Sequence, residues 1–297
     1  MRLTPLLAAA LLVAGCVSTL PPPPPAPIPA QVALHRQPDG RILVDAVIDG
    51  HGPYPFVLDT GSSVTVLDLA LVVELGLASQ GYDVTVHGVV SQSSAPAFES
   101  VSVGLGDDAI APPWVVGLDI AGLSGARGVI GIDVLSQRVI EIDHGRGVVR
   151  FGRHAYDPPT NRDYSRANLV IDSFGLPHVL VHINNRQGLA LLDTGLSGMI
   201  IDPTFAARAR VPVSTRPADL VDVLSESIPA PRTGRARLQI GKARWVIERV
   251  ALLRPAVLDR LDAGAPVVAV LGATVFEDTM LVFDFMSGAL YIVERAG

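Results

Sequence analysis

The chain has 297 residues, a formal net charge of −6, 49% hydrophobic and 18% charged residues. This length suits about two domains with real cores, and 28 glycines with 24 prolines indicate short strands joined by many turns. The acidic balance, without a long basic cluster, argues against nucleic-acid binding. Cys16 is the single cysteine, which excludes an internal disulfide and a Cys-based metal site.

The amino terminus has the pattern of a signal peptide over residues 1–16: Arg2, an apolar run, then small residues. The run is shorter than the roughly 20 apolar residues of a membrane-spanning helix. Residues 13–16, VAGC, resemble a bacterial lipobox, in which Cys16 becomes lipidated and starts the mature protein. An ordinary signal peptide cut near Cys16 is the alternative.

Val17, rather than Asp, follows this cysteine, so the resemblance implies the outer membrane, facing the periplasm. Residues 17–30 include prolines at 21–25, 27 and 29. This composition predicts a stiff polyproline tether between the membrane and the folded body.

The first folded element is a predicted hairpin. Apolar and polar residues alternate over 44–48 before Asp49 and Gly50, as in a strand entering a turn. In residues 56–63, FVLDTGSS, an apolar run is followed directly by an acid, a hydroxyl side chain and a glycine: Asp59, Thr60 and Gly61. Buried neighbours would draw Asp59 out of bulk water and raise the cost of ionising it.

Three more elements complete the first half. Asp68 is a predicted N-cap of a short helix over 68–76. Residues 128–135, GVIGIDVL, predict an apolar strand ending at glycine, and residues 142–148, IDHGRGV, predict a hairpin. A Pro-rich polar stretch, residues 157–163, then indicates a linker.

The second half repeats these elements in the same order, with Asp193 following Asp59 by 134 positions and the later elements recurring at 141. The repeated elements are a strand over 179–183 before Asn184-Asn185, ALLDTGLS at 190–197, a helix opened by Asp202 and Pro203, AVLGATVF at 269–276, and FDFMSGA at 283–289. Five features in order predict two similar lobes, residues 31–153 and 167–297, joined by a linker over 154–166. Two acids, one from each lobe, could share a single proton.

The motif at 57–63 resembles the active-site signature of aspartic peptidases of the retropepsin and pepsin type. The apolar-apolar-Gly segments at 129–131 and 270–272 look like the second signature of that family. The resemblance covers roughly residues 31–295 and implies two compact retropepsin-like lobes fused in tandem. Leu196 departs from the pattern, since Ser or Ala is usual there, and it lacks the hydroxyl with which Ser62 could bond Asp59.

The resemblance implies a mostly-β fold: two small closed β-lobes, each with one short helix, and an active site at their interface. It implies that Asp59 and Asp193 activate a water against a peptide bond without metal or cofactor. The expected supporting residues are Thr60 and Thr194, which would bond across the lobe boundary, Gly61 and Gly195, which would allow close approach and offer N–H groups, and Ser62.

The resemblance also implies that the substrate is an extended peptide and that the protein is a monomer with internal two-fold pseudosymmetry. A Gly/Ser-rich hairpin over 87–94, led by His87, Gly88 and Val89, is the predicted flap. Residues 224–233 are the corresponding candidate for a second flap in the second lobe.

Other interpretations of the same residues remain open. The two acids could be ordinary turn residues, or the fold could be a catalytically inactive, lipid-anchored pseudo-protease that binds peptides, which Leu196 would support. No Gly-x-Ser-x-Gly elbow supports a serine hydrolase.

The remaining polar and aromatic candidates are interpreted as structural. His178 and His182 share a strand face without a metal-binding spacing. Asp143 and Asp284 each precede a hairpin turn. The two tryptophans, Trp114 and Trp245, are predicted core residues.

Overall fold

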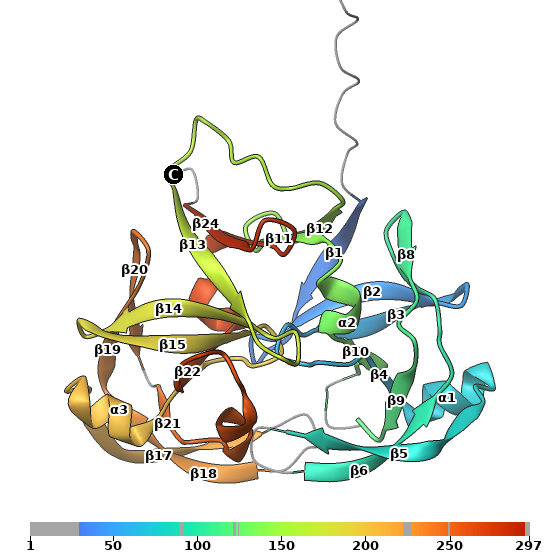
Figure 1. The fold of residues 1–297 in the computed structure, drawn as a ribbon, viewed down its shortest axis with the longest axis horizontal. Coiled ribbons are helices and arrows are strands. Elements are labelled where there is room, and N and C mark those ends of the chain that lie inside the picture. Colours follow the sequence, from blue (N-terminus) through green and yellow to red (C-terminus); the bar gives the residue numbers. More distant parts are fainter. Residues whose placement is uncertain are drawn as a thin grey trace, which may run out of the picture.

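The computed structural model describes residues 30–88, 92–120, 123, 125–221, 227–248 and 250–294. The described part of the chain is mostly β, with a few short helices, and it forms two lobes placed side by side (Figure 1). The expectations for Cys16, the tether and Val89 fall outside the described residues, apart from Ala30, which begins the first strand.

The first lobe contains twelve of the described strands and two helices. They are β1 (Ala30–Arg36), β2 (Ile42–Ile48), β3 (His51–Leu58), β4 (Val66–Asp68), α1 (Leu69–Leu75), β5 (Ser79–His87), β6 (Gln92–Phe98), β7 (Val103–Leu105), β8 (Asp108–Ile110), β9 (Val115–Leu118), β10 (Gly128–Ile130), α2 (Ile132–Leu135), β11 (Val139–Asp143) and β12 (Val148–Gly152).

The second lobe repeats this order. Its elements are β13 (Tyr164–Ile171), β14 (Pro177–Ile183), β15 (Arg186–Asp193), β16 (Met199–Ile201), α3 (Pro203–Arg208), β17 (Val213–Val221), β18 (Ser227–Thr233), β19 (Arg235–Ile240), β20 (Ala243–Glu248), β21 (Ala251–Leu252), η1 (Ala256–Arg260), β22 (Val267–Gly272), η2 (Ala273–Phe276), β23 (Thr279–Asp284) and β24 (Ala289–Glu294).

The pairing of strands is the same in both lobes. In the first lobe the neighbours run β3, β10, β4, β9, β6, β5, with β3 and β10 parallel. In the second they run β15, β22, β16, β21, β18, β17, with β15 and β22 parallel. The predicted duplication is therefore present at the level of topology.

The lobes are joined by one antiparallel sheet in the order β1, β12, β11, β23, β24, β13 (top of Figure 1). At its centre Glu141 of β11 faces Val282 of β23. These two residues are equivalent in the sequence repeat, so the pseudo-two-fold axis passes between them. Strand pairing continues from one lobe to the other through β11 and β23, and the sheet is not closed, so the expectation of closed lobes is wrong in this respect.

Both predicted hairpin turns are present, and the local backbone explains them. Asp49 and Gly50 have φ of 49° and 80°, and Asn184 and Asn185 have φ of 46° and 68°. Two consecutive positive φ values match the twist of a two-residue hairpin, and Asn, Asp and Gly tolerate them best. These turns fix the register of β2 with β3 and of β14 with β15.

Both predicted helices start at an Asp N-cap. The side chain of Asp68 accepts from the backbone N–H of Ala70 at 3.4 Å, and that of Asp202 accepts from Phe205 at 2.7 Å. One helix per lobe is an underestimate, since α2 and η2 each form a helical turn directly after the apolar-Gly strand.

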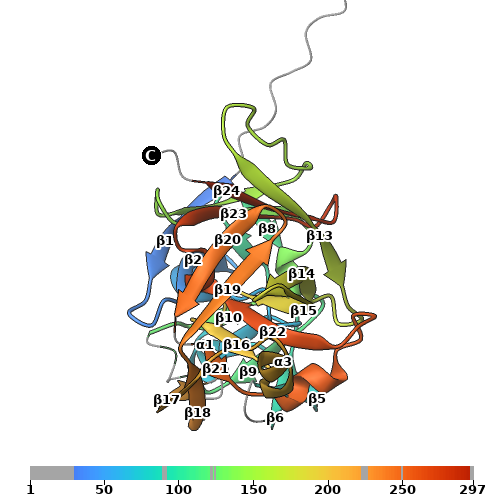
Figure 2. The same cartoon turned by 90° about the vertical axis from the view of Figure 1, so that its left-hand side faces the viewer.

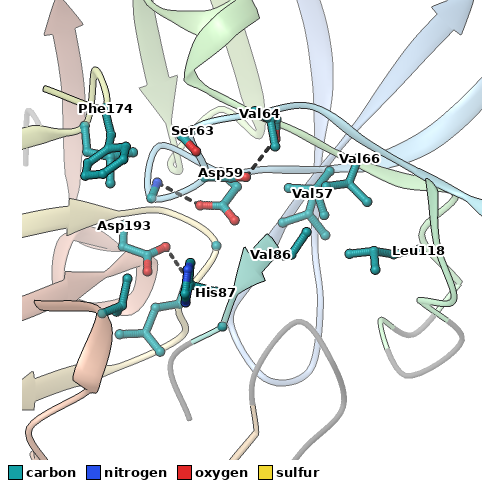
Figure 3. A pocket seen from close by; sticks show the side chains of 18 of the residues that line it. Val57, Asp59, Ser63, Val64, Val66, Val86, His87, Leu118, Phe174 and Asp193 are labelled. Carbon is teal, nitrogen blue, oxygen red and sulfur yellow. Dashed lines mark hydrogen bonds between the residues drawn. The ribbon is translucent and has the colours of Figure 1, made fainter. Parts of the chain in front are cut away.

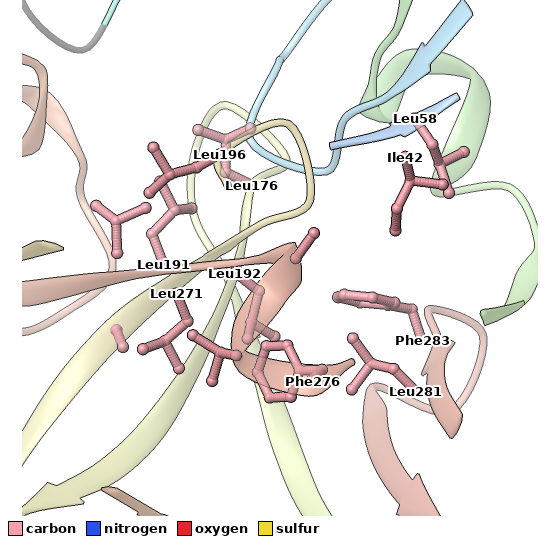
Figure 4. Close-up of a cluster of buried hydrophobic side chains, with 14 of the residues drawn as sticks. Ile42, Leu58, Leu176, Leu191, Leu192, Leu196, Leu271, Phe276, Leu281 and Phe283 are labelled. Carbon is pink, nitrogen blue, oxygen red and sulfur yellow. The ribbon is translucent and has the colours of Figure 1, made fainter. Parts of the chain in front are cut away.

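One contiguous apolar core runs through both lobes and contains residues such as Ile42 and Leu58 of the first and Leu192 and Phe283 of the second (Figure 4). A smaller cluster over the six-stranded sheet is covered by Tyr156 from the segment between the lobes. Burial raises the pKa of Tyr156 to about 12. The shared core holds the two lobes, and hence the two Asp-Thr-Gly loops, in a fixed relation.

Candidate active site

The structure brings Asp59 and Asp193 face to face between the lobes. Asp59 follows β3 and Asp193 ends β15, the two strands that lie parallel to the apolar-Gly strands. Figure 3 shows both carboxyl groups on the same side of their loops, directed into one pocket. The expected meeting of the two acids is thus what the structure shows.

The two glycines after the acids permit this approach. A Cβ added at Gly61 would lie 2.7 Å from Oδ1 of Asp193, and one added at Gly195 would lie 2.7 Å from Oδ1 of Asp59. Either contact is shorter than side-chain carbons adopt. Each acid therefore packs on the bare backbone of the opposite loop, and any larger residue would push the carboxyl groups apart.

Four hydrogen bonds between the loops hold the threonines across the boundary. The Thr60 N–H donates to Thr194 Oγ1 at 3.0 Å, and the Thr194 N–H donates to Thr60 Oγ1 at 3.2 Å. Each hydroxyl then donates into the other lobe, Thr60 to the carbonyl of Leu192 at 2.7 Å and Thr194 to the carbonyl of Leu58 at 2.6 Å. Both threonines are buried, so every donor and acceptor in this exchange depends on the other lobe.

Backbone N–H groups hold the carboxylates. Gly61 donates to Oδ1 of Asp59 at 2.8 Å, and Leu196 donates to Oδ1 of Asp193 at 2.9 Å. The expectation for the Ser62 hydroxyl is wrong: it donates to the carbonyl of Val64 at 2.7 Å and so closes its own turn instead of bonding Asp59.

Removal from water raises the pKa of both acids, but not equally. For Asp59 the rise from burial is opposed by N–H groups of Gly61, Ser62 and Gly195 and by a hydrogen bond from Asp193. For Asp193 burial is joined by the charge of Asp59 and by their mutual hydrogen bond, so its pKa lies well above the usual value. The two acids therefore titrate as a pair that holds a single proton between them over an extended pH range.

Leu196 packs mainly into the core of the second lobe. Its side chain is buried beside Leu176 and Leu191 in the main core (Figure 4). Its N–H still bonds Asp193, and its carbonyl accepts from the N–H of Ala273 at 2.8 Å. The bulk of leucine is thus largely accommodated by the core of the second lobe, and Leu196 also contributes to the lining of the cleft.

One supporting pair was not foreseen from the sequence. Asp133, two residues after the glycine of the second signature, accepts from the Thr65 N–H at 2.9 Å and from its hydroxyl at 2.8 Å. Burial raises the pKa of Asp133 against these bonds. At the equivalent place in the second lobe the Thr274 hydroxyl donates to the Ser197 carbonyl. Each pair connects the loop that carries the catalytic acid to the helical turn behind it. The sequence signal that could have revealed these pairs is the polar side chain that recurs at the equivalent positions 133 and 274.

The acids lie at the floor of a cleft of about 670 Å³. Its described lining from the first lobe is Asp39, Arg41, Val57, Asp59, Gly61, Ser62, Ser63, Val64, Val66, Val84, Thr85, Val86, His87, Gly88, Trp114, Leu118, Leu123 and Val129; from the second lobe it is Phe174, Leu176, Asp193, Gly195, Leu196, Ser197, Val257, Arg260 and Leu261. Trp114, predicted to be core, is half-buried and contributes to the apolar wall of the cleft, whereas Trp245 packs edge-on against Phe276 with ring centroids 5.6 Å apart.

The predicted flap is a hairpin of β5 and β6 in which His87 pairs with Gln92. His87 and Gly88 line the cleft (Figure 3). The second hairpin, β17 with β18, lies with β5 and β6 at the end of the molecule opposite the six-stranded sheet in both views (Figures 1 and 2). Residues 222–226 of that hairpin are outside the described part.

The residues interpreted as structural have structural partners. Asp143 accepts from the N–H groups of Gly145 and Arg146, and Asp284 accepts from Ser287. His178 is buried with Nδ1 3.0 Å from the carbonyl of Leu176. Among the described residues no group of three His, Cys, Asp or Glu is placed to hold a metal ion. Within the same residues, no helix is both long and apolar enough to span a membrane.

Comparison with known proteins agrees with this geometry. A family model described as "Aspartyl protease" matches residues 44–134 and 179–275, more than half of the sequence, so the chain belongs to the aspartyl protease family. A solved structure, the aspartic proteinase from Irpex lacteus, is similar with a TM-score of 0.54 and 13% identity over 91% of this chain and 97% of that chain. At this identity the likeness shows the fold alone. No curated protein gives a significant match.

Thr194→Val tests the exchange across the lobe boundary. It keeps the shape but leaves the Thr60 N–H and the Leu58 carbonyl unpaired, at about 1–3 kcal/mol for each buried group. We expect a lower urea midpoint at constant slope. Thr194→Ser keeps the hydroxyl and is the matched control. Equal midpoints for the Val and Ser variants would show that these bonds contribute nothing.

Asp193→Asn tests the raised pKa through stability. The pKa of Asp193 is higher in the folded protein than in the unfolded chain. At pH values between these two pKa values the folded state binds more protons than the unfolded state, so the free energy of unfolding falls as pH rises through that window. Asn cannot ionise, so the variant should be more stable than the parent above the window, on the order of 1 kcal/mol, and should lose this advantage in acid.

Asp39→Asn is the control of opposite sign for that experiment. Burial tends to raise the pKa of Asp39, but hydrogen bonds from Arg41 outweigh it and lower the pKa. The charged form is therefore stabilising above the unfolded pKa, and Asp39→Asn should reduce stability at neutral pH. Urea unfolding at several pH values measures both variants; parallel curves for parent and Asp193→Asn would refute the shift.

Proposed function

We propose that this chain is an aspartic endopeptidase, which hydrolyses peptide bonds of extended polypeptides with a water activated between Asp59 and Asp193. One observation carries the proposal: two carboxyl groups from two lobes meet in one cleft, where burial raises the pKa values of both. Such a pair holds one proton between two oxygens and can act as base and acid in one step.

The chemistry needs one ionised and one protonated acid, and in the proposed sequence Asp193 carries the proton. Asp59, ionised and supported by the Gly61 N–H, takes a proton from the water as its oxygen attacks the peptide carbonyl carbon. Asp193 gives its proton to the carbonyl oxygen, which forms a tetrahedral diol. Asp59 then protonates the amide nitrogen as the C–N bond breaks, and Asp193 recovers a proton from a diol hydroxyl. No bond forms between protein and substrate in this sequence.

The cleft suits an extended chain. The β5–β6 hairpin places His87 and Gly88 on the lining, where it can cover a peptide and pair with it as an added strand. The apolar wall that includes Val86, Trp114 and Leu118 suits large apolar side chains. This arrangement supports the assignment of the hairpin as a flap.

The protein's place in the cell is a proposal from the sequence. Lipidation of Cys16 and the Pro-rich segment after it would anchor a monomer to the outer membrane and hold its cleft in the periplasm. A net charge of −6 disfavours direct binding of the folded lobes to anionic lipid surfaces, so the lipid at Cys16 would provide the attachment.

Replacement of either acid tests the catalytic role. Asp59→Asn and Asp193→Asn should each lower the cleavage of a diverse peptide mixture on the order of 10³-fold or more, because the acids act as one unit. The surface variant Asp107→Asn is the control. Activity should need the singly protonated pair, so it should fall in acid as the pair takes up a second proton and in base as it loses its last one, and the raised pKa values should shift the profile upward.

A statine-type transition-state mimic distinguishes the proposal from a peptide-binding pseudo-protease. The mimic should block cleavage and raise the melting temperature. A protein that binds the mimic but cleaves nothing between acidic and neutral pH would be a pseudo-protease, and one that does neither would contradict both.

Cys16→Ser tests the anchor. In cells, the parent should sediment with outer-membrane fractions and the variant should be recovered in the soluble fraction, because a serine cannot take the lipid. Deletion of residues 21–29 is the control, since it shortens the tether and should leave sedimentation unchanged. Sedimentation of Cys16→Ser with membranes would place the attachment elsewhere.

A further inference from the structure

Two equivalent turns, one from each lobe, border the cleft with different chemistry. Residues 39–41, Asp-Gly-Arg, join β1 to β2, and residues 174–176, Phe-Gly-Leu, belong to the turn from β13 to β14. Their glycines have φ of +94° and +83°, so the two backbones turn alike. We call them the first-lobe tip and the second-lobe tip.

Each tip packs on the opposite lobe. A Cβ at Gly40 would meet the Thr274 side chain and lie 3.9 Å from Cβ of Ser197, and a Cβ at Gly175 would lie 3.4 Å from Cγ2 of Ile132. The pseudo-two-fold that exchanges the catalytic acids also exchanges the tips. The tips therefore flank the acids on opposite sides, and the four residues beside their glycines all line the cleft.

The first-lobe tip is charged. The Arg41 Nε–H donates to Oδ2 of Asp39 at 2.7 Å, and a terminal guanidinium nitrogen lies 2.6 Å from the same oxygen. Both contacts use one edge of a group with five N–H donors. Arg260, exposed on η1, adds a second guanidinium to the lining, so cations outnumber anions there once the catalytic acids are set apart.

The second-lobe tip is apolar and rigidly held. Oδ1 of Asp172 accepts the N–H groups of Phe174 at 2.8 Å and of Leu176 at 3.0 Å. Leu176 is buried, but Phe174 is 48% exposed. A large aromatic side chain is thus presented to the cleft on a fixed turn, where covering it would remove apolar area from water (Figure 3).

We propose that the two tips make the substrate cleft directional: peptides bind with an aromatic or large aliphatic side chain against Phe174 and an acidic side chain against Arg41. This rests on the proposed peptidase function and adds the class of peptide and the residues that select it. Since the tips lie on opposite sides of the acids, the two preferred side chains should fall on opposite sides of the cleaved bond.

Cleavage-site profiling of a random peptide library tests the proposal, with bond positions read by mass spectrometry. The parent should show apolar side chains enriched on one side of the bond and acidic ones on the other. Phe174→Ser should weaken the apolar preference about tenfold, and Arg41→Gln should weaken the acidic one. Asp39→Phe with Arg41→Leu gives both tips the same sequence and should make the profile apolar on both sides.

Matched controls remove similar groups outside the cleft: Val246→Ser, also an exposed apolar side chain, and Arg235→Leu, an exposed arginine paired with Glu248. Both should leave the profile unchanged. Binding of one peptide and its reversed sequence to Asp59→Asn, measured by fluorescence anisotropy, provides a readout independent of hydrolysis; the forward order should bind more tightly.

The outcomes separate the two proposals. Cleavage with the same preference on both sides, or a profile that Phe174→Ser and Arg41→Gln leave unchanged, overturns directional selection and leaves the peptidase in place. Order-dependent binding without cleavage supports directional selection and overturns hydrolysis. Absence of both cleavage and peptide binding overturns both.

Discussion

The reciprocal exchange of hydrogen bonds between Thr60 and Thr194 is the constraint on which the site depends. Each hydroxyl accepts from one loop and donates to a buried carbonyl of the opposite lobe, so neither loop can satisfy its polar groups alone. Moving the lobes apart would leave several buried groups unpaired at once. This cost holds the two carboxyl groups close enough to share a single proton.

Duplication supplies two equivalent acids, and small differences between the loops make them unequal. The N–H of Gly61, two positions after Asp59, donates to that carboxyl group, whereas the donor to Asp193 is the N–H of Leu196, three positions after it. Each such donor stabilises the charged form of the carboxylate that it bonds. The two acids therefore have different hydrogen-bond surroundings, although the residues themselves are the same.

Features with a local cause could be predicted from the sequence. The two-residue turns at Asp49 and Asn184, the caps at Asp68 and Asp202, and the order of elements all follow from neighbouring residues. Features that depend on distant packing could not. Ser62 bonds its own turn, Trp114 lines the cleft, and β11 pairs with β23 in the other lobe, and nothing in the adjacent sequence determines any of these.

The two tips show how selection of substrate can change without disturbing the acids. At each tip the glycine makes the contact with the opposite lobe, so that position is fixed by space and by its positive φ. The flanking positions 39, 41, 174 and 176 line the cleft. A change there alters what the cleft attracts while the Gly40 and Gly175 contacts stay in place. In a homodimer built from one such lobe both tips would be identical; fusion of the two lobes in one chain is what allows an ion pair at one and an aromatic ring at the other.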